Sequence, residues 1–178
     1  MSLKIINSLD EFPPKKERIH IARPMNMLPN SIFLAGIGAE LSAWRSHVCN
    51  LLEQASFTGT VFMPFTKPSA TAEQVEASLR WNQSAMRMST VIMFWLPVER
   101  EDLGFDTVFQ FGQHAQSAQL VVGIPKDAQY AEHVLNYYIK PYEWGAVHHT
   151  LEETTVAAME KALERTSVFN SIPAYFQT

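Results

Sequence analysis

A run of apolar residues near the middle of the chain places the strongest constraint on the fold. Val91 to Leu96 reads Val-Ile-Met-Phe-Trp-Leu, is rich in β-branched and aromatic residues, and is followed by Pro97. This composition predicts a strand buried on both faces, as in a parallel sheet covered by helices. A helical pattern precedes the run, and a polar loop with a second helical pattern follows it. The segment from Trp81 to Gly112 therefore predicts a helix–strand–loop–helix unit.

The same alternation extends along most of the chain. We predict strands at 18–22, 31–36, 60–63 and 119–124, and helices at 43–55, 71–88, about 107–117, 127–138 and after a Thr150–Glu153 capping box. In the last helix, Val156, Met159 and Leu163 share one stripe. Strands alternating with helices predict an α/β fold, with five or six mostly parallel strands and helices on both faces. Residues 1–17 are expected to form a loosely held arm before a single domain at 18–178.

Composition excludes several classes of partner. A net charge of -4, with only one short basic cluster, argues against binding to a nucleic acid polymer. The apolar run at 91–98 is too short to span a bilayer, so no membrane partner is expected. Cys49 is the sole cysteine, which excludes an intrachain disulfide and favours a cytoplasmic location. The six histidines lack the spacing of metal ligands, so we expect no metal and no other cofactor.

Ligands in parallel sheets bind at the carboxyl ends of strands, which directs attention to the loops there. The loop at 98–107 carries more charge than a plain connection needs, with Glu99, Arg100, Glu101, Asp102 and Asp106. Gly36 ends the strand predicted at 31–36, where glycine allows a tight turn or a close approach to a ligand. The glycine spacing after that strand does not fit the dinucleotide-binding fingerprint.

Several motifs occur in the order found in one known family. They are Phe33-Leu34-Ala35-Gly36, Trp44-Arg45, Val61-Phe62-Met63-Pro64, Trp81, Val91 to Pro97, Phe109-Gln110-Phe111-Gly112 and Val121 to Pro125. This order resembles the nucleoside 2-deoxyribosyltransferase-like family from about Arg18 to Arg165. The resemblance implies a flavodoxin-like three-layer sandwich and a homo-oligomer whose sites are completed by a neighbouring subunit. It also implies a small-molecule nucleoside or nucleotide as ligand.

Enzymes of that family cleave the N-glycosidic bond of a deoxynucleoside through a glutamate nucleophile and a covalent glycosyl intermediate. Gln110 stands at the position of that glutamate. Thr90 stands where an aspartate is expected before the central strand, and Asn82 follows Trp81 where glutamate is common. Each replacement keeps hydrogen-bonding capacity and removes negative charge. The fold is therefore expected to persist where the transfer chemistry does not.

Asp106 is the candidate substitute acid, because it precedes Gln110 by four residues and shares a helix face with it. Its alternative role is to cap the helix, a role for which Thr107 also qualifies. Both are candidate site residues, Asp106 for catalysis and Thr107 for substrate binding. Phe105, beside Gly104, is a candidate aromatic side chain for stacking on a base.

Three further residues are candidates for substrate binding. Arg45 is placed either to hold a phosphate or sugar oxygen or to pair with a surface carboxylate. Trp44 lies beside it, and Trp81 is placed either to stack on a nucleobase or to fill the core.

These residues leave three functional interpretations open. The first is an enzyme acting on the N-glycosidic bond by transfer or hydrolysis, with Gln110, Asp106 and Thr90 at its centre. The second is a catalytically inactive relative that binds a nucleoside or nucleotide. The third is an oligomeric scaffold whose cleft is filled by side chains.

Overall fold

The computed structural model describes residues 3–7, 27–36, 42–64, 70–96, 105–115, 117–128, 136 and 146–171. Within these ranges, the side chains of residues 42, 105, 106 and 169–171 are not described. In chain order the elements are β1 (Lys4–Asn7), β2 (Leu28–Gly36), α1 (Ser42–Gln54), β3 (Thr60–Met63), α2 (Ala72–Met88), β4 (Ser89–Trp95), α3 (Phe105–His114), β5 (Leu120–Gly123) and α5 (Leu151–Ser171). The predicted edge strand at 18–22 lies outside the described residues.

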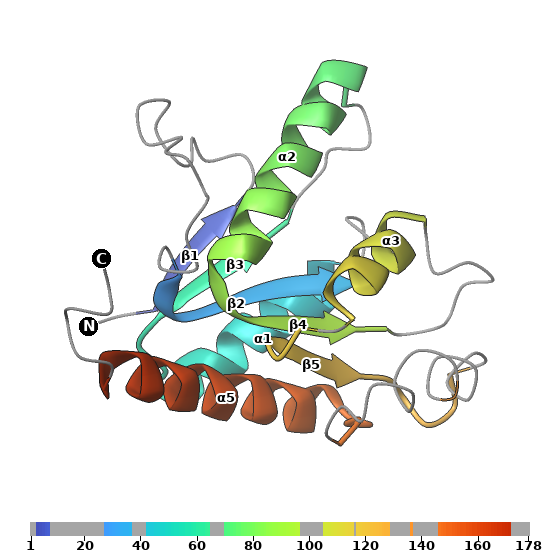
Figure 1. The fold of residues 1–178 in the computed structure, drawn as a ribbon. Helices are drawn as coiled ribbons and strands as arrows, with labels where there is room; N and C mark the ends of the chain where they lie inside the picture. Colours follow the sequence, from blue (N-terminus) through green and yellow to red (C-terminus); the bar gives the residue numbers. More distant parts are fainter. Residues whose placement is uncertain are drawn as a thin grey trace.

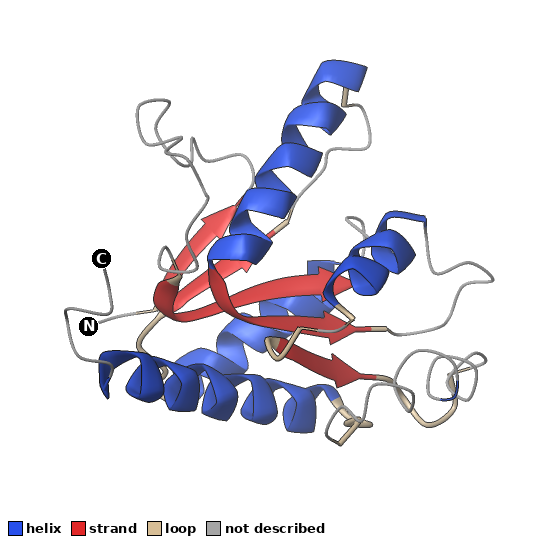
Figure 2. Ribbon diagram, viewed as in Figure 1, coloured by secondary structure: helices blue, strands red, loops and turns tan. Residues whose placement is uncertain are grey.

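The strands form one sheet in the order β1-β3-β2-β4-β5, and every neighbouring pair is parallel. Helices α2 and α3 lie on one face of this sheet and α1 and α5 on the other (Figures 1 and 2). The predicted α/β fold with three layers is therefore confirmed.

The core is divided by the sheet into two clusters because strand side chains alternate between its faces. On β4, Val91, Met93 and Trp95 lie in the cluster under α1 and α5. Ile92 and Phe94 lie in the cluster under α2 and α3. This alternation explains why the central run of the sequence is apolar at every position, as predicted for a strand buried on both faces.

Strands β3, β2, β4 and β5 follow the flavodoxin-like order 2-1-3-4, when β2 is counted as the first strand. Beyond β5, the backbone of His148 forms a parallel bridge with Gly123. Its N–H donates to the carbonyl of Val122 (3.1 Å), and its carbonyl accepts from Ile124 (2.8 Å). The fold is therefore flavodoxin-like, and among the described residues this bridge occupies the fifth position of the order.

The opposite edge of the sheet holds β1, which lies within the segment predicted as a loosely held arm. Lys4 to Asn7 pair in register with Thr60 to Met63 of β3, so these four residues belong to the sheet. The sequence does not reveal this strand because it is short and only Ile6 is buried. A four-residue strand of this kind lacks the alternation that identifies longer ones.

The outer edge of β5 is closed by side chains and backbone from the following segment. The Nζ of Lys161 donates to the carbonyl of Leu120 (2.8 Å), beside the two backbone bonds made by His148. Open strand edges invite pairing with other chains, and a lysine at the edge is one way to prevent it. α5 therefore closes the sheet on this side as well as covering its face.

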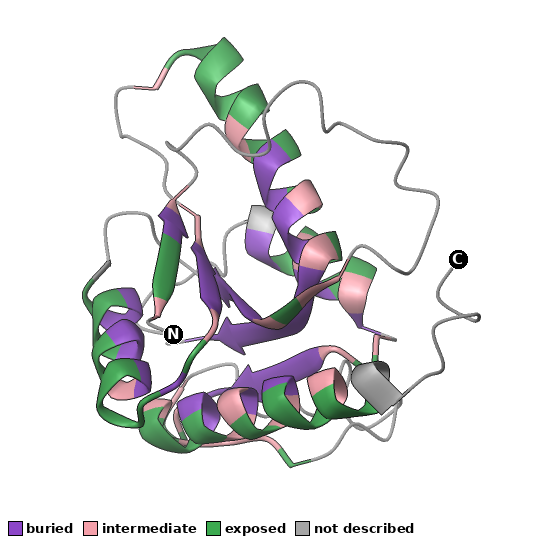
Figure 3. Ribbon diagram, turned by 90° about the vertical axis from the view of Figure 1, so that its left-hand side faces the viewer, coloured by how far each residue is buried: buried purple, intermediate pink, exposed green. Residues whose placement is uncertain are grey.

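Helix α2 begins with the capping arrangement that its sequence predicts. Thr71 Oγ1 accepts from the Gln74 backbone N–H (3.3 Å), and the Gln74 side chain accepts from the Thr71 N–H (2.9 Å). The helix is buried only from Trp81 onward, whereas its first half extends beyond the sheet and is exposed (Figure 3). Val75 and Leu79 are 38% and 37% exposed there.

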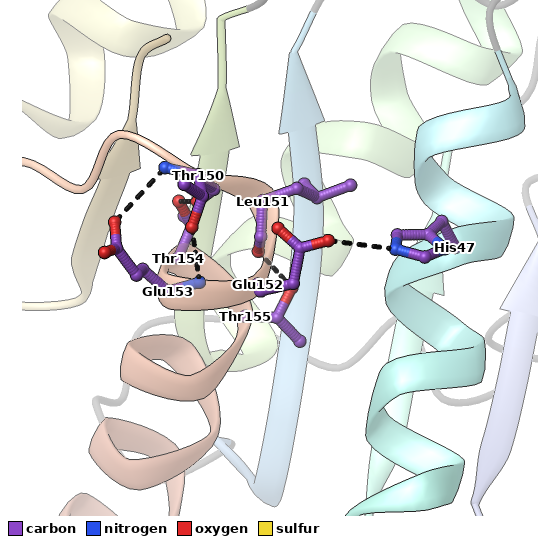
Figure 4. A network of polar contacts seen from close by, with 7 residues as sticks. All are labelled: His47, Thr150, Leu151, Glu152, Glu153, Thr154 and Thr155. Carbon is purple, nitrogen blue, oxygen red and sulfur yellow. Dashed lines mark hydrogen bonds and ion pairs between the residues drawn. The ribbon is translucent and has the colours of Figure 1, made fainter. Parts of the chain in front are cut away.

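The capping box at the start of α5 is also confirmed (Figure 4). Thr150 Oγ1 accepts from the Glu153 N–H (3.1 Å), and the Glu153 carboxylate accepts from Thr150 and His149. Nearby, Glu152 meets His47 of α1 at 3.3 Å, which links the two helices on this face. The His47 and backbone hydrogen bonds lower the pKa of Glu152 below its ordinary value.

The predicted stripe of α5 is not the buried one. Val156 and Leu163 are 48% and 44% exposed. The helix instead buries four small or β-branched side chains, namely Thr154, Thr155, Ala158 and Ala162. Both threonine hydroxyls donate to carbonyls one turn earlier, at 2.6 and 2.7 Å. Because their hydroxyls are already hydrogen-bonded, Thr154 and Thr155 pack as small apolar groups and allow the helix to lie close to the sheet.

Two predicted helix starts were also wrong. Lys126 and Asp127 form a turn, and Ala128 N–H bonds to the Pro125 carbonyl (3.1 Å), so no helix begins at Asp127. Residues 129–135, 137 and 138 of that predicted helix lie outside the described residues. Helix α3 begins at Phe105, so Asp106 lies inside its first turn and does not precede it as a cap.

Candidate functional site

The topological switch point of the sheet lies between the carboxyl ends of β2 and β4, because the connections after these two strands run to opposite sides. The chain leaves β2 into α1 on one face and leaves β4 into α3 on the other. In open parallel sheets, this arrangement opens a crevice between the two strand ends, and ligands bind there. The first turns of α1 and α3 both begin at this edge, and their free N–H groups favour negative charge.

Gly36 ends β2 at this edge and pairs in register with Trp95 of β4. Its φ of +143° belongs to a region that other residues rarely adopt. A Cβ added at Gly36 would lie 2.1 Å from the Trp95 carbonyl oxygen and 3.3 Å from Cζ2 of Trp44. Glycine is therefore required for the two strand ends and the first turn of α1 to approach so closely.

Trp44 and Arg45 bring polar groups to the same point from the first turn of α1. An Arg45 Nη2 donates to the Gly36 carbonyl (2.9 Å), and the guanidinium lies 4.7 Å from the Trp44 ring centroid. Arg45 is only 4% exposed, and burial lowers its pKa to about 10. Trp44 is 8% exposed, and its Nε1 has no hydrogen-bond partner among the residues that the structure describes.

Gln110 approaches the edge from α3 on the opposite face. It is half-buried and lies beside Phe111, whose ring packs edge-on against Phe94 at a centroid distance of 5.2 Å. Phe94 immediately precedes Trp95, so this contact holds α3 over the carboxyl end of β4. Thr107, one turn before Gln110, is 8% exposed and shares the sheet-facing side of the helix.

Trp81 and Asn82 lie on α2, which shares its face of the sheet with α3. The Trp81 ring packs against Phe33 (6.3 Å) and Phe62 (6.1 Å), so it forms part of the core. Asn82 is 8% exposed. Within the described residues, neither Nε1 of Trp81 nor Oδ1 of Asn82 has a hydrogen-bond partner. These contacts support the interpretation of Trp81 as a core residue.

Thr90 is not brought to this edge. It is the second residue of β4 and lies at the amino end of the sheet, away from Gly36 and Gln110. Its hydroxyl donates to the Leu28 carbonyl (2.8 Å), and its N–H donates to Ser31 Oγ (2.9 Å). The prediction for Thr90 rested on its position before the central strand, where the family resemblance places an aspartate. Its hydrogen bonds instead connect β2 and β4.

Phe105 and Asp106 lie in the first turn of α3, but their side chains are outside the description. The charged loop predicted at 98–104 also lies outside it. Within the described part of the chain, no three His, Cys, Asp or Glu side chains are grouped to hold a metal ion.

Sequence reasoning missed the packing at the end of β5. A Cβ at Gly123 would meet Thr154 Oγ1 at 2.2 Å and Trp95 Cε3 at 2.6 Å. Glycine thereby lets the start of α5 pack against the carboxyl edge of the sheet. The available signal was a glycine between buried residues of a strand, which indicates a close approach by a neighbouring segment.

The fold and the paired helix starts define a doubly wound parallel domain with its switch point between β2 and β4. The family model described as nucleoside 2-deoxyribosyltransferase like matches residues 29–128, more than half of the 178-residue chain. The protein belongs to this family, as its motifs predict. The match covers β2 to β5, whereas β1 and α5 lie outside it. None of the curated proteins compared with the chain matches it. Among the described helices, none is long and apolar enough to cross a membrane.

Proposed function

We propose that this protein binds a nucleoside or nucleotide at the switch point and does not carry out covalent pentosyl transfer. The proposal rests on Gln110, which is half-buried on α3 beside the carboxyl end of β4. The family resemblance places a nucleophilic glutamate at this position. A neutral carboxamide is a poor nucleophile toward an acetal carbon, and losing a covalent nucleophile costs on the order of 10⁴ to 10⁶ in rate.

The surrounding groups support binding of a polar, partly aromatic ligand. Asn82 and Gln110 carry carboxamides that both donate and accept hydrogen bonds, and they come from helices on the same face of the sheet. Burial, with the charge of Arg87 on α2 as a second cause, lowers the pKa of His114 on α3. This coupling indicates that the C-terminal ends of the two helices lie within range of each other's charge.

A hydrolytic enzyme is the second candidate function, and the start of α3 favours it. Asp106 lies one helical turn before Gln110 inside the same helix. Residues four apart share a helix face. In this proposal Asp106 accepts a proton from a water molecule as the water oxygen attacks the anomeric carbon. The C–N bond breaks with its electron pair going to the base, the base takes up a proton from solvent, and the products are a free sugar and a free base.

Incubation of the protein with deoxyadenosine or deoxyinosine and a second free base separates these functions. Chromatography then measures transfer and hydrolysis, and calorimetry measures binding of the nucleoside. We expect binding without released base. Released base that disappears in Asp106→Asn would favour hydrolysis. Absence of both binding and turnover would contradict the proposed function.

Gln110→Glu is the sharpest test of the role assigned to position 110. Restoring the carboxylate should create measurable base release, because an oxocarbenium-like transition state is stabilised by adjacent negative charge. Gln113→Glu is the matched control, since it adds the same charge to an exposed position of α3. Equal activities of the two variants would show that position 110 does not face the sugar.

The assembly and location follow as further proposals. Exposed apolar side chains on neighbouring helices, Val75 and Leu79 on α2 and Val108 and Phe109 on α3, support a homo-oligomer. Light scattering coupled to gel filtration would measure the mass directly. Cys49 is a buried free thiol, and the lack of a second cysteine for a disulfide supports a reducing compartment such as the cytoplasm.

A further inference from the structure

The first turn of α1 carries donor groups that the binding of an unphosphorylated nucleoside does not require. Arg45 and Trp44 are both more than nine-tenths buried, although each carries polar atoms. A buried indole N–H without an acceptor costs free energy, because it gives up its hydrogen bond to water and gains none in return. Such a group in a native structure requires an explanation, and a bound ligand or ordered water that accepts the hydrogen bond is one of them.

Both side chains lie beside the same backbone position, Gly36. Cζ2 of Trp44 lies 3.3 Å from the Cβ position of Gly36, and Nε1 is attached to the ring carbon next to Cζ2. The Arg45 guanidinium reaches the same residue through its 2.9 Å bond to the Gly36 carbonyl. The N-terminus of a 13-residue helix starts two residues before Trp44 and adds the positive end of its dipole.

We propose that Trp44, Arg45 and the first turn of α1 bind the phosphate group of a nucleoside monophosphate. A phosphate monoester supplies several acceptor oxygens together with negative charge, and it suits a guanidinium, a helix N-terminus and an indole N–H at one point. This inference rests on the proposed function and specifies its ligand as a nucleotide.

The arrangement of the two faces fits this ligand. Gly36 and Trp95 end neighbouring strands, which run about 4.8 Å apart in a sheet. The phosphate would lie at α1 beside β2, and the sugar would cross the strand ends toward Gln110 beside β4. The requirement for glycine at position 36 keeps this path free of a side chain.

Calorimetry with deoxyadenosine, deoxyadenosine 5′-monophosphate and inorganic phosphate, in a buffer without phosphate and at fixed ionic strength, tests the inference. We expect the monophosphate to bind at least about tenfold more tightly than the nucleoside, as charge-assisted hydrogen bonds of this kind provide. Trp44→Phe removes the N–H and keeps an aromatic ring. It should weaken monophosphate binding about three- to tenfold, and it should weaken nucleoside binding less than that.

Arg45→Gln should remove most of the preference for the monophosphate, whereas Arg80→Gln, which deletes an exposed arginine on α2, should leave it intact. Thermal melting of each variant identifies any loss of folding, and Trp44→Phe keeps the test decisive if Arg45→Gln does not fold. Equal affinity of the wild type for nucleoside and monophosphate would overturn the phosphate inference and leave the proposed function standing. A preference that survives in Trp44→Phe and Arg45→Gln would also overturn it. If neither the nucleoside nor the monophosphate binds, the proposed function is wrong. In that case the phosphate inference is also wrong, unless inorganic phosphate binds to the wild type and not to the two variants, a result that would support the anion site alone.

Discussion

Replacement of Gly36 by alanine tests the geometry of the switch point, because the expected cost follows from two observations. The new Cβ would lie 2.1 Å from the Trp95 carbonyl oxygen, well inside the 3.4 Å at which ordinary contact begins. That oxygen belongs to the backbone of β4, so relief requires the ends of β2 and β4 to move apart. The residue would also have to hold a φ of +143°.

The magnitude combines backbone strain with lost strand pairing. A residue other than glycine in such a region costs about 1–3 kcal/mol. Separating the strand ends weakens the pairings of Ala35 with Phe94 and of Gly36 with Trp95, at about 1 kcal/mol for each hydrogen bond lost. We therefore expect Gly36→Ala to lower the free energy of unfolding by about 3–5 kcal/mol, a large part of the ~5–15 kcal/mol of a typical domain.

Gly112→Ala provides a matched control, because it makes the same substitution at a glycine of α3. A Cβ at Gly112 meets no heavy atom within 4 Å, and the residue lies in the interior of α3. Alanine there should raise stability by about 0.5–1 kcal/mol, because glycine loses more backbone entropy in a helix. Urea denaturation followed by circular dichroism gives both values from one experiment. Equal effects of the two substitutions, or a tolerated Gly36→Ala, would refute this description of the strand ends.

Three further outcomes are expected. Phe111→Ala should cost about 3–5 kcal/mol in urea denaturation, because it removes a buried ring that holds α3 on the sheet. Lys161→Met should cost about 1–2 kcal/mol and increase self-association in light scattering, because it exposes a carbonyl at the outer edge of β5. His114 has a pKa lowered below 6.5 in the folded state, so the unfolded state binds more protons between the two values. The contribution of His114 to stability is therefore fully present above pH 6.5 and is lost as the pH falls through the folded-state pKa. His114→Gln should make the free energy of unfolding less dependent on pH between these two values.

The sequence predicted the sheet well where the strands are fully buried. The runs that became β2, β3, β4 and β5 are apolar at nearly every position, because helices cover both faces. The predicted helix start near Thr71 and the predicted capping box at Thr150 are both present, since Thr71 and Thr150 each bond within a few residues of the chain. Local chemistry of this kind is readable without knowledge of the fold.

The missed features depend on contacts between distant segments. The buried face of α5 consists of small side chains and of threonines that satisfy their own hydroxyls, so the larger Val156 and Leu163 indicated the wrong stripe. Thr90 was assigned to the site by its position before the central strand. That position is the amino end of β4, and a parallel sheet places its crevice at the other end. By contrast, Gly36, Trp44 and Arg45 are close in sequence, and the structure brings them together.

Electrostatics at the switch point connects the absent nucleophile with the proposed phosphate site. Cleavage of an N-glycosidic bond develops positive charge on the sugar, so it is favoured by a neighbouring carboxylate and opposed by a neighbouring cation. Around this edge the described side chains supply a neutral carboxamide at Gln110 and a buried guanidinium at Arg45. That combination disfavours the cationic transition state of glycosidic cleavage and favours binding of an intact, anionic nucleotide. Base release by Gln110→Glu should therefore increase further when Arg45→Gln is added, provided the double variant folds. A decrease with the nucleoside as substrate would show that the arginine assists the chemistry directly.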